Sequence, residues 1–245
     1  MTKTIILIPS RLNASRLPNK PLLKINNKSL INHVYEKGKS TNLGQVYVAT
    51  GDKEIFEEVV NNNGKSILTR KNHLTGTDRI YEAYEQLNLN DISYIINLQG
   101  DEPLIDTKDI INLNNLAIKN DSEIATMACK LDKKDIKNEN VVKVTCDNDI
   151  ETKNISSAKK FLRLNNNQTY RYIYHHIGIY IYKVSVLKKF VSLKQTSSEI
   201  NLKLEQLRAI DNNIKIDVVF AKSVPIGVDT YEDYLEIKKL MEYKI

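Results

Sequence analysis

Short runs of apolar, β-branched residues alternate with amphipathic stretches along the first half of the chain. The runs predict strands at Thr4 to Ile8, Val46 to Ala49, Ser66 to Thr69, Tyr94 to Leu98 and Ile124 to Lys130. The stretches between them predict helices at Ser29 to Lys39, Lys53 to Val60, Asp78 to Gln86 and Thr107 to Ala117. Alternation of this kind is typical of βαβ units, because parallel strands need a helical crossover. We therefore expect an α/β fold with a doubly wound, mostly parallel sheet.

The pattern of predicted strands and helices changes in the second half of the chain. It predicts strands at Val141 to Cys146, Tyr172 to Tyr182 and Ile216 to Phe220, and helices near Ser185 to Val191, at Glu199 to Ile210 and from Tyr231 onward. The polar stretch from Asn148 to Gln168 is expected to protrude as a mobile lid or a dimerisation element. Repeats and low-complexity linkers are missing from the sequence. We expect one domain, 1–245, with a smaller protruding subregion at about 148–182.

Composition and charge narrow the class of protein. A chain of 245 residues with 41% hydrophobic and 27% charged residues can bury a substantial core. Its 36 basic and 30 acidic residues give a net charge of +6, but the lysines occur as dispersed pairs such as Lys133-Lys134. Dispersed pairs are typical of solvated faces, so we expect no nucleic-acid partner. A modest basic excess suits small polyanionic substrates.

The lengths of the apolar stretches and the two cysteines indicate in which cellular compartment the protein is found. No apolar stretch is long enough to span a bilayer, and the apolar segment Ile5 to Ile8 is too short for a signal-peptide core. Cys129 and Cys146 lie in apolar runs and are expected to be buried free thiols. The prediction is a cytoplasmic protein without a membrane partner.

A basic loop follows the first predicted strand. Arg11, Arg16 and Lys20 lie on it, together with Ser15 and prolines that limit its conformations. In an open parallel sheet, ligands bind beyond the carboxyl ends of the strands, so the loop faces that crevice. A solvated basic loop is the alternative, but three cations at one strand end favour a triphosphate site. The glycine spacings of a P-loop and of G-x-G-x-x-G are missing.

A second strand end carries a Thr-Gly-Thr segment. Gly76 permits close approach of the backbone, and Thr75 or Thr77 could cap the following helix. The N-terminus of that helix would face an anion or a base edge. Capping alone would also explain the segment.

Each of the two remaining motifs contains a carboxylate that could bind a metal ion. Asp101 comes after the most apolar strand, where it could hold Mg²⁺ or simply form a Gly-Asp-Glu-Pro turn. Near the C-terminus, Thr230 is expected to cap the last helix with Asp233 as an imperfect capping-box partner. That leaves Asp229 without a structural task, so it is the candidate for a second metal ligand.

Six segments, in the same order and over nearly the whole chain, resemble the 3-deoxy-manno-octulosonate cytidylyltransferases, or CMP-KDO synthetases. They are R-L-N-A-S-R-L-P-N-K-P-L from Arg11, T-R-x-x-H-x-T-G-T-D-R from Thr69, N-L-Q-G-D-E-P from Asn97, H-I-G-I-Y from His176, L-E-Q-L-R from Leu204 and G-V-D-T from Gly227. The resemblance implies a Rossmann-like nucleotidyltransferase fold, Mg²⁺ as cofactor and a homodimer. It also implies transfer of CMP from CTP to the anomeric hydroxyl of 3-deoxy-manno-octulosonate (KDO), with release of pyrophosphate, for lipopolysaccharide biosynthesis.

The same resemblance implies roles for individual residues. The residues that bind the CTP phosphates are Arg11 and Lys20, with Ser15 and Arg16 completing the loop. Those around the cytidine are Arg70, Thr75, Gly76 and Thr77. The ligands of Mg²⁺ are Asp101 and Asp229, and Arg11, Lys20 and Asp101 are the catalytic set. The residues that line the sugar-acid pocket are Gln99, His176, Tyr180, Glu205 and Gln206.

The chain departs from the family pattern at three places, of which the loss of an arginine bears on the acceptor. Asn19 stands where the family has glycine, and asparagine also adopts left-handed turns. Ser157 lies in the segment that replaces the family's Y-F-S-R stretch, whose arginine would pair with the sugar carboxylate. His175 replaces a frequent arginine. Cations that could substitute are Lys159, Lys160, Arg163 and Arg171. The alternatives are a different ulosonic acid, amino-substituted or sialic-acid-like, or a catalytically silent nucleotide-binding paralogue.

Overall fold

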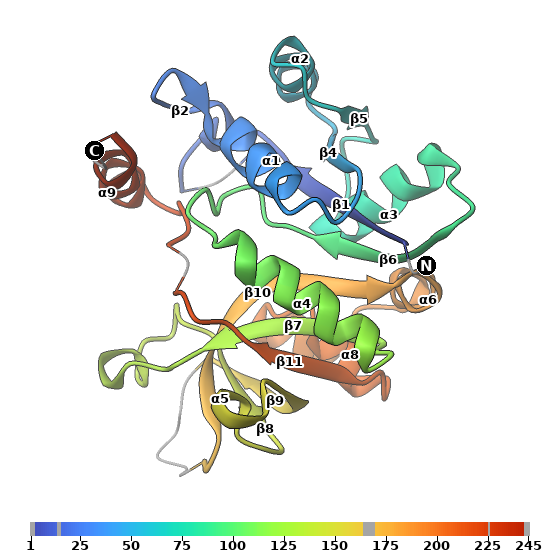
Figure 1. Ribbon diagram of the computed structural model, residues 1–245, viewed down its shortest axis with the longest axis vertical. Helices are drawn as coiled ribbons and strands as arrows, with labels where there is room; N and C mark the ends of the chain where they lie inside the picture. The colour runs from blue at the N-terminus through green and yellow to red at the C-terminus, as the bar shows by residue number, and fades with distance from the viewer. Residues whose placement is uncertain (1–2, 14–15, 164–169, 225, 243–245) are drawn as a thin grey trace. The chain divides into compact units, whose positions relative to one another are not determined.

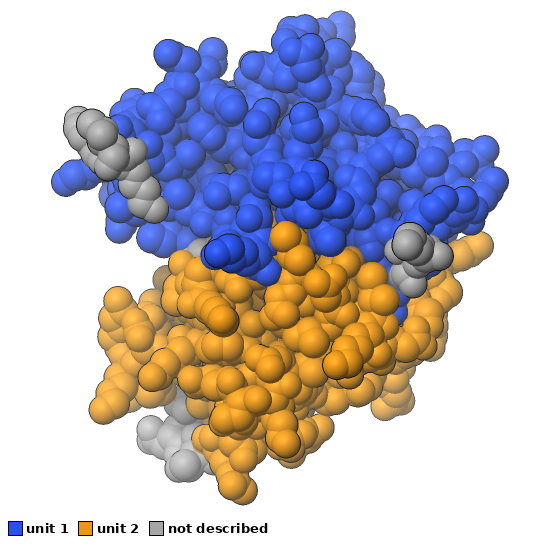
Figure 2. Space-filling view, viewed as in Figure 1, with its two compact units in different colours: residues 1–108, 225–245 blue, residues 109–224 orange. Residues whose placement is uncertain are grey.

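A computed structural model describes residues 3–13, 16–163, 170–224 and 226–242. The chain folds into two compact units, residues 1–108 with 225–245 and residues 109–224, which Figures 1 and 2 show. The predicted α/β class with a largely parallel sheet is confirmed. The single-domain organisation of 1–245 stays a prediction.

The first unit contains a parallel sheet with strand order β5-β4-β1-β6 (Figure 1). The strands are β1 (Lys3–Ser10), β4 (Val46–Thr50), β5 (Ser66–Leu68) and β6 (Ile92–Asn97). The connecting helices are α1 (Leu30–Ser40), α2 (Lys53–Asn61) and α3 (Gly76–Leu87). The chain moves outward from β1 to β5 and then returns to β6 on the other side of β1. Because such crossovers are right-handed, α1 and α2 cover one face and α3 the other, as predicted for a doubly wound sheet.

The reversal of direction occurs between β1 and β6. These two strands are parallel neighbours, with Ile6 opposite Ile96 and Leu7 opposite Asn97. The loops that follow them therefore leave from the same edge of the sheet. This is the topological switch point at which open α/β sheets bind ligands.

The C-terminal segment anchors the loop after β1. Helix α9 (Tyr231–Glu242) packs on a small hairpin, β2 (Lys24–Ile25) and β3 (Lys28–Ser29), which the hydrophobic pattern did not predict. The buried side chains of this cluster are Leu17, Ile25, Leu30, Val228, Tyr234 and Ile237. Full burial of one such aliphatic side chain contributes about 2 kcal/mol. The cluster thereby fixes residues 17–20 and 228–230 within one unit.

The second unit is mainly antiparallel. Its strands are β7 (Ile124–Cys129), β8 (Lys143–Cys146), β9 (Ile155–Leu162), β10 (Ile173–Lys183) and β11 (Ile216–Phe220). They follow the order β10-β7-β11-β9-β8, and β8 also pairs with β10, so the five strands form a closed circuit. Only β7 and β11 are parallel neighbours among these strands as described. The remaining elements are α4 (Thr107–Lys119), which crosses the residue boundary at 108, η2 (Lys133–Asp135), α5 (Ile150–Lys153), α6 (Val184–Ser192), α7 (Ser197–Leu202) and α8 (Leu207–Asp211).

For the second half, one strand was missed and one helix prediction was wrong. Residues 155–162, in the polar stretch for which no strand was predicted, form β9, which pairs with β11 on one side and β8 on the other. The role of this stretch as a protruding lid or dimerisation element stays a prediction. The apolar pattern missed β9 because serine fills a buried position at Ser156, and Ser157 donates to Asp217 Oδ1 over 3.3 Å. The single helix predicted at Glu199 to Ile210 is interrupted, because Lys203 adopts a left-handed conformation with φ 51°.

The predicted state of the two thiols is confirmed. Cys129 and Cys146 are buried and free, and burial raises the pKa of both thiols to about 12. In the described part of the chain, no helix has the length and apolarity needed to cross a membrane.

Candidate nucleotide site

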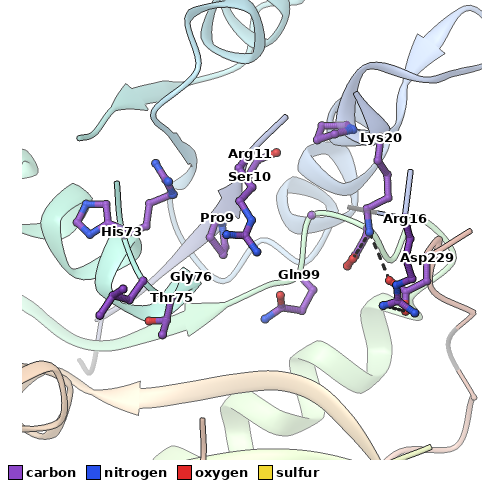
Figure 3. A pocket seen from close by; sticks show the side chains of 15 residues that line it. Pro9, Ser10, Arg11, Arg16, Lys20, His73, Thr75, Gly76, Gln99 and Asp229 are labelled. Atoms are coloured by element: carbon purple, nitrogen blue, oxygen red, sulfur yellow. Dashed lines mark hydrogen bonds and ion pairs between the residues drawn. The ribbon is translucent and has the colours of Figure 1, made fainter. Parts of the chain in front are cut away.

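A polar cavity of about 340 Å³ opens in the first unit at the carboxyl edge of its parallel sheet (Figure 3). Its volume is in the range of about 300–1,000 Å³ that is usual for small-molecule sites. The lining residues come from the end of β1 and the loop after it, from the loop between β5 and α3 and the first turn of α3, from the loop after β6 and from the segment before α9: Pro9, Ser10, Arg11, Arg16, Lys20, Pro21, His73, Leu74, Thr75, Gly76, Arg79, Gln99, Gly100, Asp101 and Asp229. Four of these side chains are cationic and two are carboxylates, so the cavity favours a polyanion.

Lys20, Asp101 and Asp229 converge at one end of the cavity. Lys20 Nζ lies 2.7 Å from Asp101 Oδ2 and 3.5 Å from Asp229 Oδ1. It also donates to the carbonyl of Val228 over 2.7 Å, and Arg16 Nη2 lies 3.1 Å from Asp229 Oδ2. The spatial convergence expected from the loop positions is therefore present.

Local backbone geometry explains how Lys20 reaches this position. Asn19 adopts the left-handed conformation predicted for it, with φ 57°, immediately before the short helix η1 (Lys20–Leu22). Its N–H donates to the carbonyl of Leu12 over 3.2 Å, and Leu12 N–H donates to Asp52 Oδ2 over 2.8 Å. The described part of the basic loop is thus closed on itself and tied to the residue that precedes α2.

The two carboxylates are held by the segment before α9. Val228 N–H donates to the carbonyl of Asp101 over 2.9 Å. The predicted cap of α9 is confirmed, since Asp233 N–H donates to Thr230 Oγ1 over 3.2 Å and Asp233 Oδ2 accepts from Thr230 N–H over 2.8 Å. Asp233 Oδ2 also accepts from Asp229 N–H over 2.9 Å. Asp229 uses only its backbone in the cap, which leaves its carboxylate facing Lys20 and Arg16.

Glu102 is a third acid at this end, and the sequence assigned it no role. Its Oε2 atom is buried and has no hydrogen-bond partner among the described residues. Burial, and then the charges of Asp101 and Asp229, raise the pKa of Glu102 to about 8. A mostly neutral Glu102 avoids a third negative charge beside the other two. No sequence signal distinguishes it, because its burial depends on packing.

The N-terminus of α3 forms the other end of the cavity. Thr75 is the N-cap, and its side chain accepts from Asp78 N–H over 3.1 Å. Of the two predicted capping residues, Thr75 and Thr77, the first is therefore confirmed. A side chain at Gly76 would place its Cβ 3.2 Å from Pro9 Cγ, so this close packing of α3 on β1 favours glycine. In Figure 3, Thr75, Gly76 and His73 lie across the cavity from Lys20 and Arg16. Unpaired N–H groups at a helix N-terminus can bind an anion or the acceptor atoms of a base.

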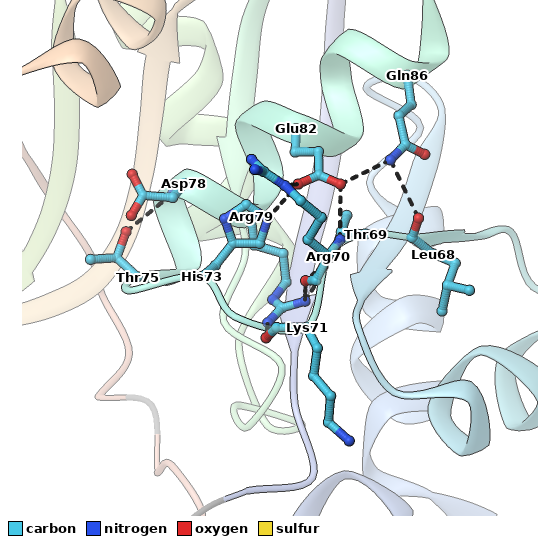
Figure 4. A network of polar contacts seen from close by, with 10 residues as sticks. All are labelled: Leu68, Thr69, Arg70, Lys71, His73, Thr75, Asp78, Arg79, Glu82 and Gln86. Atoms are coloured by element: carbon cyan, nitrogen blue, oxygen red, sulfur yellow. Dashed lines mark hydrogen bonds and ion pairs between the residues drawn. The ribbon is translucent and has the colours of Figure 1, made fainter.

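A polar network centred on Glu82 braces the loop between β5 and α3 (Figure 4). Glu82 Oε2 lies 2.9 Å from Arg70 Nε and 2.6 Å from His73 Nε2. Burial alone would raise the pKa of Glu82, but its hydrogen bonds with Arg70 and His73 outweigh burial and lower that pKa to about 2. The carboxylate is therefore ionised at neutral pH and holds both Arg70 and His73.

Two residues assigned to the cytidine by resemblance do not line this cavity. Arg70 is engaged with Glu82, and Thr77 is buried, with Asn97 Nδ2 3.5 Å from its hydroxyl. Arg79, to which the sequence assigned no role, does line it. Its guanidinium donates to Thr69 Oγ1 over 2.7 Å and to two carbonyls of the loop over 3.1 Å each. Ser15 lies outside the described residues.

A family model for cytidylyltransferases matches residues 5–216 of the chain. The chain belongs to the cytidylyltransferase family. It is 37% identical over 238 residues to a 3-deoxy-manno-octulosonate cytidylyltransferase of Bartonella tribocorum, covering 97% of this chain and 98% of the relative. It is 40% identical over 233 residues to the enzyme of that name from Brucella canis, covering 94% of this chain and 92% of the relative. A solved structure of CMP:2-keto-3-deoxy-manno-octonic acid synthetase complexed with CTP matches with a TM-score of 0.89, 32% identity and full coverage of both chains.

The second unit of this cytidylyltransferase carries most of the residues that the resemblance assigns to the sugar acid. His176 and Tyr180 lie on β10 with ring centroids 5.6 Å apart, and Glu205 and Gln206 lie in the turn before α8. Burial, and then the charge of His175, lower the pKa of His176 to about 3. Burial, and then the charges of Tyr182 and Glu205, raise the pKa of Tyr180. Both side chains are therefore uncharged at neutral pH. The remaining member of the set, Gln99, lines the cavity of the first unit.

The cations proposed as substitutes for the missing arginine have other partners. Arg163 donates to the carbonyls of Leu202, Glu139 and Lys203 over 2.7–3.2 Å. Lys159 pairs with Asp147 over 3.0 Å, and Arg171 lies 5.1 Å from the ring centroid of Tyr172. Lys160 is exposed. Ser157 binds Asp217, as described above, so no cation of this segment has a geometry that marks it as the replacement.

Proposed function

We propose that this cytidylyltransferase transfers CMP from CTP to the anomeric hydroxyl of KDO and releases pyrophosphate. The observation that carries the proposal is the convergence of Lys20, Asp101 and Asp229 at one end of a cavity whose other end is the N-terminus of α3. The relatives of the same length bear the name of this activity. A triphosphate would extend from the charged end, and the base would lie toward Thr75 and Gly76.

The cationic side chains of the cavity suit an in-line displacement at the α-phosphorus. Negative charge accumulates on the phosphate oxygens and on the leaving pyrophosphate during such a reaction. Arg11 and Lys20 would neutralise that charge, and Arg16 would orient the chain of phosphates. Catalysis then rests on positioning and electrostatic stabilisation rather than on a covalent enzyme intermediate.

Asp101 and Asp229 would hold Mg²⁺. In the described residues no group of three or more histidine, cysteine, aspartate or glutamate side chains could hold an ion by itself. Mg²⁺ commonly uses only one or two carboxylates and completes its shell with substrate phosphates and water. The Lys20 ammonium lies 2.7 Å from Asp101 and 3.5 Å from Asp229, and this positive charge between the two carboxylates supports the proposal of a cation site. When bound, the ion would supply positive charge that polarises the phosphoryl group.

A different ulosonic acid is the second candidate acceptor. The observation that favours it is the place of Ser157, whose hydroxyl is bonded to Asp217 where the family pattern has an arginine for the sugar carboxylate. An acceptor whose carboxylate is bound by another route would tolerate this change. The reaction class is the same for both acceptors.

Pyrophosphate release tests the proposal. The purified protein is assayed with CTP and Mg²⁺ against KDO, an amino-substituted KDO and a sialic acid, with a chelator as the metal control. We expect the highest kcat/KM with KDO and loss of turnover with the chelator. Preference for another acceptor would replace KDO in the proposal, and absence of turnover with every acceptor would leave the silent paralogue.

The resemblance adds two further expectations. We propose that the protein is a homodimer, which light scattering of the full chain would test. We also propose that its product serves lipopolysaccharide assembly in the cytoplasm, which complementation of a strain lacking the activity would test.

A further inference from the structure

Thr126 lies at the centre of a buried polar cluster in the second unit. Its side chain is completely buried on β7, and its Oγ1 atom lies 3.0 Å from His176 Nε2. Oγ1 is also 3.0 Å from the carbonyl of Ile177 and 2.8 Å from that of Ile179. Three polar groups of β10 thus meet one hydroxyl.

An irregularity in β10 brings these groups together. Ile177 pairs with Met127 and Tyr180 pairs with Thr126, so the register between β10 and β7 shifts between Ile177 and Tyr180. At this shift two β10 carbonyls, those of Ile177 and Ile179, lie within hydrogen-bonding distance of the Thr126 hydroxyl. A buried carbonyl without a donor is costly, so the hydroxyl replaces bonds that the regular ladder would have supplied.

The number of protons on these groups sets the direction of each hydrogen bond. A threonine hydroxyl has one proton and two lone pairs. The two carbonyls can only accept, so they take the single proton of Thr126. The oxygen then has only lone pairs left for His176, so His176 Nε2 must carry a proton and donate it to Oγ1. For the neutral His176 ring this arrangement leaves Nδ1 as the acceptor.

We propose that Thr126 is a positioning residue that fixes His176 as the Nε2–H tautomer. The other ring nitrogen of His176, Nδ1, is then an acceptor. An acceptor suits a hydroxyl group of a sugar and does not suit its carboxylate. The part of this inference that concerns the sugar rests on the proposed function, whereas the tautomer does not.

The tautomer is measured directly. Long-range ¹H–¹⁵N spectra of histidine-labelled protein near pH 7 report which ring nitrogen of each of the four histidines carries a proton. The His176→Gln variant assigns the His176 signals. We expect a protonated Nε2 and an unprotonated Nδ1 in the wild-type protein. An Nδ1–H tautomer or an imidazolium in the wild type would overturn the proposal, whether or not any variant folds.

Two substitutions then separate positioning from packing. Thr126→Val keeps the shape and removes the hydroxyl, whereas Thr126→Ser keeps the hydroxyl and removes the methyl group. For Thr126→Val we expect loss of the single tautomer and about a tenfold rise in the KM for KDO, the size of one lost hydrogen bond, with the KM for CTP within about twofold. Thr126→Ser should retain the wild-type tautomer and the wild-type KM for KDO. Equal effects of the two variants would contradict a positioning role.

The two readouts also separate this inference from the proposed function. If the wild type shows the Nε2–H tautomer but does not turn over KDO, the proposed acceptor fails and the assignment of Thr126 stands. If it turns over KDO and Thr126→Val leaves the tautomer unchanged, the assignment of Thr126 fails and the proposed function stands.

Discussion

Each unit contains a cluster of opposite charges, and the two clusters differ in how completely their groups are satisfied. In the first unit, Lys20 is paired with two carboxylates whose side chains are 33% and 52% exposed, and Arg16 beside them is 61% exposed. In the second unit, Glu199 and Arg208 are both 3% exposed. Arg208 donates to Glu199 through two nitrogens, over 2.9 and 2.6 Å, and lies 4.7 Å from the centroid of the Phe190 ring.

The polar groups around the two clusters differ in the same way: the Glu199 carboxylate accepts further hydrogen bonds, whereas one carboxylate oxygen near Asp101 has no hydrogen-bond partner in the described part of the chain. The Glu199 carboxylate also accepts from Gln195 Nε2 over 3.1 Å and from Thr196 N–H over 3.3 Å in a complete capping box. Beside the first cluster, by contrast, Glu102 Oε2 is buried without a partner among the described residues. A saturated buried pair stabilises one conformation, whereas carboxylates open to solvent can exchange partners for a ligand. We infer that the first cluster serves binding and the second serves structure.

The largest expected effect is on turnover in the first cluster. Asp101→Asn removes one charge from the proposed Mg²⁺ site, so we expect kcat to fall about a hundredfold or more, the size of losing a key electrostatic group. Pyrophosphate release at saturating CTP and KDO measures it. Asp106→Asn, on the same loop but outside the cavity lining, is the control and should retain most activity. Near-normal turnover of Asp101→Asn would remove the metal assignment.

The second effect is on stability in the other cluster. Glu199→Gln removes the carboxylate charge that lies 2.6 Å from the buried Arg208, whereas Glu205 lies 3.9 Å from it. We expect the free energy of unfolding to fall by about 2–3 kcal/mol, since breaking a buried pair exposes an uncompensated charge. Denaturant unfolding measures it. The exposed pair Lys183–Asp121 is the control, and Asp121→Asn should cost less than about 1 kcal/mol. If both variants lost the same free energy of unfolding, the buried pair would not be more stabilising than the exposed one, and the proposed structural role of the second cluster would be wrong.

A third substitution tests whether the first cluster acts through CTP. Lys20→Gln keeps a polar side chain and removes the cation that faces the proposed phosphate site. We expect kcat/KM for CTP to fall at least about tenfold, the value of one charge-assisted contact, while the melting temperature changes little. Lys24→Gln, exposed and four residues later, is the matched control. A large loss of stability without a change in the KM for CTP would give Lys20 a structural role instead.

The smallest effect is a pH dependence in the network beside the cavity. The pKa of Glu82 falls from 4.5 to about 2 on folding, so its stabilising contribution is fully present above pH 4.5 and is lost as the pH falls toward 2. Because its partner Arg70 is 81% exposed, we expect only about 1 kcal/mol. Unfolding of Glu82→Gln at pH 6 and pH 2.5 measures the change, with Glu85→Gln on the same helix as control. A difference from wild type that persists undiminished at pH 2.5 would contradict the ionic origin.

The boundaries of most elements were predictable because the spacing of apolar residues within a segment depends only on that segment. The strand at Ile216 to Phe220 agrees with the structure at both ends, and helix α3 begins two residues before its predicted start. Strand β9 was missed because most of its stability comes from backbone pairing with two neighbours rather than from alternating apolar side chains. The break at Lys203 was missed because a lysine carries no signal for a left-handed conformation.

By itself, the sequence determined the alternation of strands and helices, and hence a parallel sheet with its ligand loops at the carboxyl edge. It also determined which cations and carboxylates stand on those loops, since strand direction alone decides which end each loop leaves. Only the tertiary structure decided that Lys20 lies between Asp101 and Asp229, that the Glu102 Oε2 atom is buried beside them, and that Thr126 meets three groups of β10. Those relations join segments remote in the sequence and depend on packing and desolvation, which no local pattern of residues encodes.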